Sequence, residues 1–280
     1  MTDLEQVRSF WSENPLWTGE SDYAAGSKEF FEEHRNVYIH DCFAGEFDLR
    51  FLPPPRSNGQ NMRVLDLGCG IGFWTAEFAM RGLSHVVAAD LTPAALENTQ
   101  KRLNTYGIDA DLREENAERL SFPDASFDHV NCQGVIHHTP DTEQAVAEIS
   151  RILKPGGTAS ISVYYRNPIL KLWPYIRWIG YPLAAIGGGL KGRGRENIFL
   201  EKDVNEIVRL YDGDKNPLGK CYSRGEFAAM LEKHFDVKET YLHFFPARAL
   251  PFKIPHCLHK WLDGHIGFMV YASVVKPCVE

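Results

Sequence analysis

Three glycines at alternate positions, Gly68, Gly70 and Gly72, follow a short apolar run in the first third of the chain. Apolar residues at helical spacing come next, so this stretch predicts a strand, a tight turn and the start of a helix. Glycine tolerates positive φ and lets a ligand approach the backbone without a Cβ in between. Because open α/β sheets bind ligands at the carboxyl ends of their strands, we expect a ligand at this turn.

The spacing of the glycines also limits the class of ligand. A dinucleotide site needs Gly-x-Gly-x-x-Gly or Ala, whereas Phe73 occupies the last of these positions. A pyrophosphate is therefore disfavoured, and a nucleoside without phosphates fits better. Asp90 and Leu91 close the next predicted strand, where a carboxylate can accept hydrogen bonds from both ribose hydroxyls.

Two later strands are also followed by candidate ligand contacts. Asn116, Ala117 and Glu118 come after a strand predicted at 109–113, whereas Gln133 and Gly134 come after one predicted at 127–132. Since the carboxyl ends of parallel strands meet at one edge of the sheet, we expect these residues to share the site of the glycine turn.

The neighbouring His137 and His138 are the candidate catalytic residues. Histidine titrates near neutrality and suits the role of general base for a nucleophile that enters protonated. Adjacent side chains do not point the same way, so we expect one histidine to support the following turn. Asp66 has two open roles, which are contact with an amino group of the ligand through water and stabilisation of the turn.

Taken together, these motifs over about residues 62–163 resemble class I S-adenosylmethionine-dependent methyltransferases. The His pair is similar to the ubiquinone/menaquinone-type branch, which acts on small molecules. The resemblance implies S-adenosylmethionine as cofactor, with contacts from Asp66, Gly68, Cys69, Gly70, Gly72, Asp90, Leu91, Asn116, Ala117, Glu118, Gln133 and Gly134. Asn116 stands where the family commonly has Asp, so the backbone of Ala117 and the side chain of Glu118 are the favoured contacts to adenine.

The order of the predicted elements agrees with this fold class. Strands are predicted at 63–67, 85–90, 109–113, 127–132 and 157–164, and helices at 73–81, 93–106 and 141–152. Alternating strands and helices form a parallel sheet that is covered on both faces. Two more strands, at 235–241 and 268–275, complete a doubly wound, mostly parallel sheet of seven strands, in which the resemblance implies that the last is antiparallel.

The chain is predicted to have three parts. Residues 1–60 form an N-terminal helical lid that ends in a linker at 53–60, residues 61–164 with 221–280 bind the cofactor, and residues 165–220 form an inserted cap. Candidate substrate contacts come from the lid, the strand before the cap and the cap itself. They are Tyr38, Tyr164, Tyr165, Arg166 and Trp173.

The inserted cap has an unusual composition. Between residues 164 and 195 there are six Lys or Arg and no Asp or Glu, beside many aromatic residues. Prolines and glycines interrupt the segment, which argues against a membrane-spanning helix. Three roles are open: a helical layer packed on the sheet, a wall of a pocket for a hydrophobic acceptor, or a peripheral membrane contact.

The composition restricts the wider function. A chain of 280 residues with 44% hydrophobic residues can bury a sizeable core. Its net charge of −7 argues against a nucleic-acid partner, and six cysteines without a Cys-x-x-Cys pair favour reduced thiols. No metal-ligand spacing is visible, and no secretory signal begins the chain, so we expect a cytoplasmic enzyme.

The expected reaction is methyl transfer to a small acceptor, with oxygen as the first choice of acceptor atom and carbon as the second. The alternatives are an NAD-dependent oxidoreductase and a non-catalytic cofactor-binding protein of the same fold. The sequence does not specify the acceptor or the oligomeric state.

Overall fold

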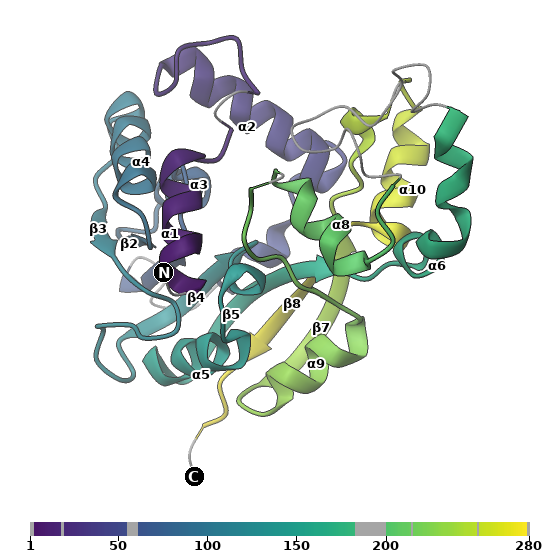
Figure 1. Cartoon of the computed structure of the whole chain (residues 1–280). Coiled ribbons are helices and arrows are strands. Elements are labelled where there is room, and N and C mark those ends of the chain that lie inside the picture. The colour runs from purple at the N-terminus through teal and green to yellow at the C-terminus, as the bar shows by residue number, and fades with distance from the viewer. Residues whose placement is uncertain are drawn as a thin grey trace.

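The computed structural model describes residues 3–17, 20–54, 61–182, 200–213, 215–250 and 252–278. A mixed sheet forms its centre, with the strand order β3-β2-β1-β4-β5-β8-β7 (Figure 1). The strands are β1 (Arg63–Leu67), β2 (His85–Asp90), β3 (Asp111–Glu114), β4 (Phe127–Gln133), β5 (Leu153–Tyr165), β7 (Asp236–His243) and β8 (Met269–Val275).

The topology confirms the predicted fold class. The strands from β1 to β5 pair in parallel, and β8 lies antiparallel between β5 and β7. A two-residue strand that was not predicted, β6 (Cys221–Tyr222), pairs with the end of β5. The chain therefore returns from the segment after β5 directly to the carboxyl edge of the sheet.

The start of β5 differs from the prediction. The strand was predicted at 157–164, but β5 already begins at Leu153, directly after α5. The register between β4 and β5 shifts between Phe127 and His129, which absorbs the extra residues. Gly156 has a φ of +70° and donates its N–H to the Lys276 carbonyl. The glycines thus bend an irregular strand instead of separating it from the helix.

Local capping explains where the helices of the sheet begin. These helices are α3 (Phe73–Met80), α4 (Pro93–Tyr106), α5 (Thr142–Ile152) and α9 (Arg224–Glu232). Thr92 and Asp141 accept hydrogen bonds from backbone N–H groups at the starts of α4 and α5. Ser223 and Glu226 form a capping box at the start of α9.

Alternate residues of β1 face opposite sides of the sheet. Leu65 and Leu67 belong to the core shared with α5 and α9, whereas Val64 packs with Trp74 and Phe78 of α3 on the other face. Burying each such side chain contributes about 1.5–3 kcal/mol. The two cores hold the strand ends in a fixed position for the site.

The N-terminal region is helical, with α1 (Asp3–Glu13), α2 (Lys28–Phe43) and the short η1 (Leu49–Phe51). Figure 1 shows α2 above the sheet and α1 in front of it. The Arg35 Nε donates to the buried Glu77 carboxylate of α3 at 2.6 Å. The Arg102 guanidinium of α4 is also buried and contacts the Phe31 carbonyl and His34. These contacts anchor α2 to the helices beneath it.

The segment after β5 contains α6 (Pro168–Ile176), η4 (Arg177–Gly180) and α8 (Val204–Tyr211). Helix α10 (His256–Ile266), which was not predicted, lies near α6 (Figure 1), and the Asn167 side chain donates to the Ile266 carbonyl. Most of the predicted linker, at 55–60, lies outside the described residues, as do the cap residues Lys191, Arg193 and Arg195. Among the helices of the described segments, none is long and apolar enough to cross a membrane.

Candidate active site

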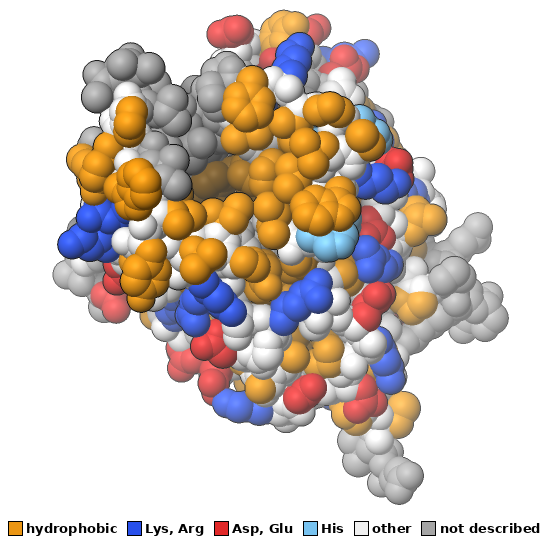
Figure 2. All heavy atoms as spheres, turned by 90° about the vertical axis from the view of Figure 1, so that its right-hand side faces the viewer, with side chains coloured by type: hydrophobic (Ala, Val, Ile, Leu, Met, Phe, Trp, Pro, Cys, Tyr) orange, Lys and Arg blue, Asp and Glu red, His pale blue; other side chains and the backbone are white. Residues whose placement is uncertain are grey.

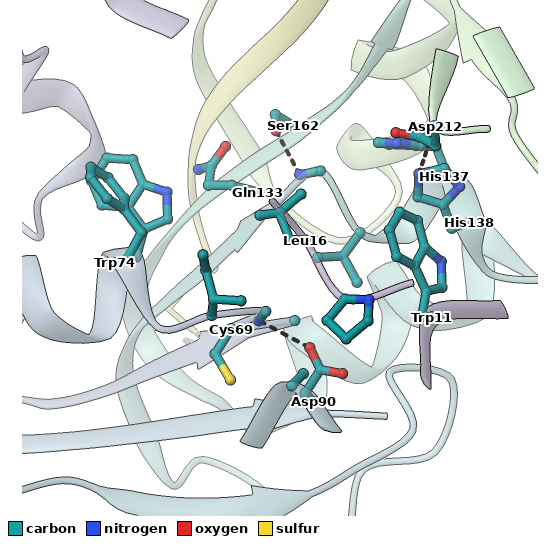
Figure 3. Close-up of a pocket in the computed structure, with 18 of the residues that line it drawn as sticks. Trp11, Leu16, Cys69, Trp74, Asp90, Gln133, His137, His138, Ser162 and Asp212 are labelled. Atoms are coloured by element: carbon teal, nitrogen blue, oxygen red, sulfur yellow. Dashed lines mark hydrogen bonds and ion pairs between the residues drawn. The ribbon is translucent and has the colours of Figure 1, made fainter. Parts of the chain in front are cut away.

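One cavity of about 340 Å³ opens at the carboxyl ends of β1, β2, β4 and β5, where the strand order changes direction (Figure 3). Ligands of open α/β sheets bind at such a switch point. Thirteen of the predicted site residues line it: Tyr38, Gly68, Cys69, Gly70, Asp90, Leu91, Asn116, Ala117, Gln133, Gly134, His137, His138 and Tyr164. The topology therefore gathers most of these dispersed residues around one space.

The glycine turn forms the floor of the cavity. Gly68, Gly70 and Gly72 have φ of +74°, +56° and +75°, which side chains other than glycine rarely adopt. A Cβ on Gly68 would lie 2.1 Å from Val135 Cγ2, whereas one on Gly70 would meet only Leu16, at 3.7 Å. The turn is closed on one side by packing and stays open toward the cavity.

Asp90 is held in place by backbone and side-chain donors. The Gly70 N–H donates to Asp90 Oδ2 at 3.1 Å, and the Thr92 N–H and Oγ1 both donate to Oδ1 at 3.0 Å. Burial raises the pKa of Asp90, against the opposing effect of these hydrogen bonds. Its carboxylate is thus oriented at the edge of the cavity and can accept further hydrogen bonds from a ribose.

Gln133 presents an acceptor with no partner. Its Nε2 donates to the Asn131 and Ser160 side chains, but its buried Oε1 makes no hydrogen bond. Next to it, the Gly134 N–H donates to Ser162 Oγ at 3.0 Å. Together with the glycine floor and Asp90, this buried acceptor fits a nucleoside that carries a donor such as an ammonium group. S-adenosylmethionine has both features.

The segment after β3 places two of its three predicted residues at the cavity. Glu115, Asn116 and Ala117 line it, but Glu118 does not, because its carboxylate accepts the Asp141 N–H at 2.5 Å. Glu115, which the prediction missed, accepts the Ser121 N–H at 2.8 Å.

His138 lies in a polar cluster at the end of the cavity opposite Asp90 (Figure 3). Its Nδ1 lies 2.6 Å from the Leu218 carbonyl, and its Nε2 lies 3.4 Å from Asp212 Oδ2. Tyr164 Oη donates to the same carboxylate at 2.7 Å. Because the carbonyl of Leu218 only accepts, the hydrogen on Nδ1 points to it, and Nε2 is the ring nitrogen next to Asp212.

His137 has a different environment. It is fully buried, its ring lies 4.1 Å from that of Tyr164, and neither ring nitrogen has a hydrogen-bond partner. Burial lowers its pKa well below the usual range, with smaller contributions from His138 and Lys220, while the Ser162 backbone acts weakly in the opposite direction. His137 is therefore an uncharged part of the cavity wall.

The N-terminal helices form the roof of the cavity. Val7 and Trp11 of α1 line it together with Val37 and Tyr38 of α2. The Trp11 ring meets that of His138 edge to face at 5.2 Å, and Tyr38 Oη accepts the Trp74 Nε1–H at 3.3 Å. Aromatic side chains from distant parts of the chain thus shield the polar cluster from water.

Asp66 lies beneath the turn and does not line the cavity. Thr75 Oγ1 and Asn131 Nδ2 donate to its two carboxylate oxygens at 2.6 and 2.9 Å. Burial raises the pKa of Asp66 to about 6, against these hydrogen bonds. This arrangement agrees with the turn-stabilising role rather than with ligand contact. Gly72 likewise starts α3 and packs on Thr99 outside the lining.

Three predicted substrate contacts also lie outside the lining. Arg166 pairs with Glu226 and donates to the Cys221 carbonyl, and Tyr165 packs against the core beneath α5 and α9. Trp173 Nε1 donates to the Glu201 carbonyl at 3.1 Å. The turn at the end of β5 directs these side chains to neighbouring elements instead.

The lining contains residues that sequence reasoning missed. They are mainly Trp11, Glu115, Ser162, Asp212 and Arg248. The sequence could have indicated two of them, because Glu115 follows β3 and Ser162 belongs to β5, and both strands end at the cavity. Asp212 and Arg248 had no such signal, because they come from distant segments. In the part of the chain that the structure describes, no three His, Cys, Asp or Glu side chains are grouped as metal ligands.

Comparisons with known proteins agree with this geometry. Residues 65–161 match the family described as "Methyltransferase domain". A ubiquinone biosynthesis O-methyltransferase of Dechloromonas aromatica is 34% identical over 172 residues, which cover 59% of this chain and 73% of that protein. The protein of the same name from Hahella chejuensis is 37% identical over 107 residues, 38% of this chain and 44% of its own length.

A solved SAM-dependent methyltransferase of Methanosarcina mazei has the same fold, with a TM-score of 0.51, 19% identity and coverage of 79% of this chain and 94% of its own. The chain spans about half the length of most curated relatives that it matches. The matched segment contains the glycine turn, Asp90, Gln133 and the histidine pair. By this similarity and by its fold, the chain belongs to the class I S-adenosylmethionine-dependent methyltransferases.

Proposed function

We propose that this protein transfers the methyl group of S-adenosylmethionine to a small, hydrophobic acceptor, with a hydroxyl oxygen as first choice and carbon as second. The observation that carries the proposal is the single cavity that joins a nucleoside-type end, at Asp90, to a polar cluster at His138. Methyl transfer to a nucleophile that enters protonated needs a binding site for the methyl donor and, next to it, a base that accepts the proton of the nucleophile.

The residues at the first end would hold the cofactor. Asp90 would accept hydrogen bonds from the ribose hydroxyls, and Gln133 Oε1 would accept one from the ammonium group. Asn116 and Ala117 would lie beside the adenine ring. When bound, S-adenosylmethionine supplies an activated methyl group on a good leaving group. The protein then contributes mainly alignment, which can account for about 7–11 kcal/mol of the barrier.

His138 is the proposed general base. Its side chain keeps 7% of its surface exposed, whereas His137 is fully buried. The Leu218 carbonyl fixes the proton on Nδ1, so Nε2 can take a proton from the acceptor hydroxyl. Asp212, 3.4 Å away, would stabilise the positive charge that forms on the ring. This assigns separate roles to the two histidines, with His137 as wall.

The walls near this cluster favour a hydrophobic acceptor. Trp11, Leu16, Tyr211 and Phe244 line the cavity from four different segments. Each CH₂ group that a ligand buries against them contributes about 0.8 kcal/mol to the binding free energy. The O-methyltransferase names of the relatives support oxygen as the first choice. We infer that α1 and α2 act as a lid over this space.

Calorimetry and a transfer assay test the proposal. S-adenosylmethionine and S-adenosylhomocysteine should bind and NAD should not, and a labelled methyl group should reach some member of a panel of lipophilic phenols and alcohols. Binding of NAD without S-adenosylmethionine would identify an oxidoreductase instead. Cofactor binding with no transfer to hydroxyl or carbon acceptors would identify a non-catalytic binding protein.

A further inference from the structure

Large hydrophobic side chains are exposed together on one side of the molecule. Figure 2 shows this face as a broad, hollowed hydrophobic region, and Figure 1 shows α6 and α10 on that side. We define the aromatic face as the exposed side chains of Ile169, Leu172, Tyr175, Trp178, Tyr181, Leu200, Phe252, Leu258 and Trp261. In the described segments only four other large hydrophobic side chains are exposed, namely Leu16, Tyr23, Leu49 and Met80.

The exposure of these side chains is large. Tyr175, Trp178 and Trp261 are 76%, 63% and 55% exposed. Isolated exposed apolar residues are ordinary, but a contiguous group of this size marks a surface that binds something. The face includes segments far apart in the sequence, namely α6 with η4, Leu200, and α10 with Phe252 before it. Two separate helices present it, so it is not the unburied side of a single helix.

The charges beside the aromatic face are mainly positive. Lys171 and Arg177 lie on α6 and η4, which contain no Asp or Glu, and Lys253 precedes α10. The one acid of α10, Asp263, is buried and contacts His243.

Nearby acids are engaged with local donors. Lys260 pairs with Glu46, and Glu201 accepts the N–H groups of Lys202 and Asp203. Backbone N–H groups do not cancel the charge of Glu201, but Lys171, Arg177, Lys202 and Lys253 outnumber Glu201 and Asp203. The charge next to the aromatic side chains is therefore positive, although the whole chain carries −7.

The combination of residues indicates which partner fits. Tryptophan and tyrosine prefer the boundary between acyl chains and water, and lysine and arginine reach from it toward anionic headgroups. Helices with such a composition lie in the plane of the bilayer surface. A protein partner could bind the aromatic side chains alone. The positive side chains beside them are explained better by an anionic lipid surface.

We propose that the aromatic face docks on the surface of an anionic lipid bilayer, with Trp178 and Trp261 inserted at the headgroup level. The proposal uses the α10 residues outside the predicted inserted cap, and it does not depend on the methyl-transfer reaction. Trp173 has no part in it, because its indole N–H donates to the Glu201 carbonyl inside the protein.

Co-sedimentation of the full chain with vesicles tests the proposal. Vesicles of phosphatidylcholine and phosphatidylglycerol in equal parts should bind the protein, and vesicles of phosphatidylcholine alone should bind it at least tenfold more weakly. Binding should weaken as salt rises, since salt screens the basic side chains. Trp178→Ser with Trp261→Ser should lower the partition coefficient at least tenfold.

A matched pair controls for general effects of the substitutions. Tyr23→Ser with Met80→Ser alters two exposed hydrophobic side chains outside the aromatic face, and it should leave binding within twofold. Lys171→Glu with Lys253→Glu should weaken binding at least fivefold per residue, on the order expected for a basic side chain near an anionic surface. Lys101→Glu with Arg113→Glu, on α4 and β3 at the opposite side of Figure 1, should have little effect.

Three outcomes would overturn the proposal. They are absence of binding to anionic vesicles, equal binding of the wild type and the lysine variant, and a dimer that dissociates in the tryptophan variant without any vesicle binding. Thermal unfolding of each variant checks that it is folded. The lysine variant keeps the test decisive even if the tryptophan variant fails to fold, because both lysines are exposed.

Discussion

Tyr164 Oη donates to Asp212 Oδ2 at 2.7 Å, which joins the end of β5 to the segment that follows α8. Asn216 Nδ2 supports the same oxygen at 3.3 Å, and His138 Nε2 lies 3.4 Å from it. A carboxylate from the inserted segment is thus held against the histidine pair that follows β4. The insertion lines the cavity with Tyr211 and Asp212 and not with the predicted Tyr165, Arg166 and Trp173.

Asp212→Asn should lower kcat because the amide no longer stabilises a protonated His138. We expect a decrease of about tenfold to a hundredfold, within the range of general-base effects, while the Kd of S-adenosylmethionine changes less than twofold. Asp203→Asn, at the other end of α8, keeps the capping group and serves as the control. An unchanged kcat in Asp212→Asn would contradict the proposed role.

Asp90→Ala should weaken binding of both S-adenosylmethionine and S-adenosylhomocysteine. Each charge-assisted hydrogen bond contributes about 1.5–3 kcal/mol, so the Kd measured by calorimetry should rise at least tenfold. Asp109→Ala, which removes an exposed carboxylate just before β3, should leave the Kd within twofold. Equal affinities of wild type and Asp90→Ala would show that ribose binds elsewhere.

Cofactor binding should slow hydrogen exchange in α1 and α2. Both helices line the cavity, and a ligand beneath them adds contacts that opening would break. Exchange in α9, which packs on the other face of the sheet, should stay the same with and without S-adenosylhomocysteine. Identical exchange of α1 and α2 in both states would mean that they form a static layer.

The contribution of His243 to stability should depend on pH. Its ring lies between Asp263 and Asp48, at 2.5 and 2.9 Å, and although burial acts to lower its pKa, these two carboxylates raise it overall. A raised histidine pKa stabilises the fold fully below the unfolded value of about 6.5 and less as pH rises through the folded pKa. The Tm difference between wild type and His243→Gln should therefore be largest near pH 6 and shrink toward alkaline pH.

The exposed His85 provides the control for that experiment. His85→Gln, which alters an exposed ring, should give a small Tm difference. A His243→Gln difference that is constant from pH 6 to alkaline pH would show that the ring acts by packing alone.

Gly68→Ala should destabilise the protein more than Gly107→Ala. Both glycines have positive φ, which costs about 1–2 kcal/mol for alanine, but only at Gly68 would the Cβ strike Val135, at 2.1 Å. The overlap adds about 1–3 kcal/mol, measurable by urea denaturation. Nothing lies within 4 Å of a Cβ at Gly107. Equal losses at the two positions would show that Val135 moves aside without cost.

The strands and helices of the sheet could be predicted because their signals are local. The glycine turn, the caps at Thr92 and Asp141, and the capping box at Ser223 each depend on residues within a few positions of one another. Boundaries were less predictable where backbone pairing overrides local preference. The strand predicted at 157–164 already begins at Leu153, and hydrogen bonds of Gly156 and Gly157 to Lys276, just after β8, keep the glycines in an irregular strand.

The candidate cofactor residues were predictable for the same reason. They follow strand ends, and parallel strands bring their carboxyl ends to one edge, so sequence position alone predicts that Asp90 and Gln133 meet there. Glu118 and Arg166 also follow strand ends, but partners elsewhere in the chain, Asp141 and Glu226, determine where their side chains point.

The sequence by itself determined the family and the fold class, and it predicted which residues follow the strand ends at the cavity, because these depend on short-range spacing. Only the tertiary structure decided that Asp212 joins His138, that α1 roofs the cavity, and that α6 and α10 share one exposed aromatic face. These relationships connect segments far apart in the chain. Their formation depends on packing between helices, which no local pattern encodes.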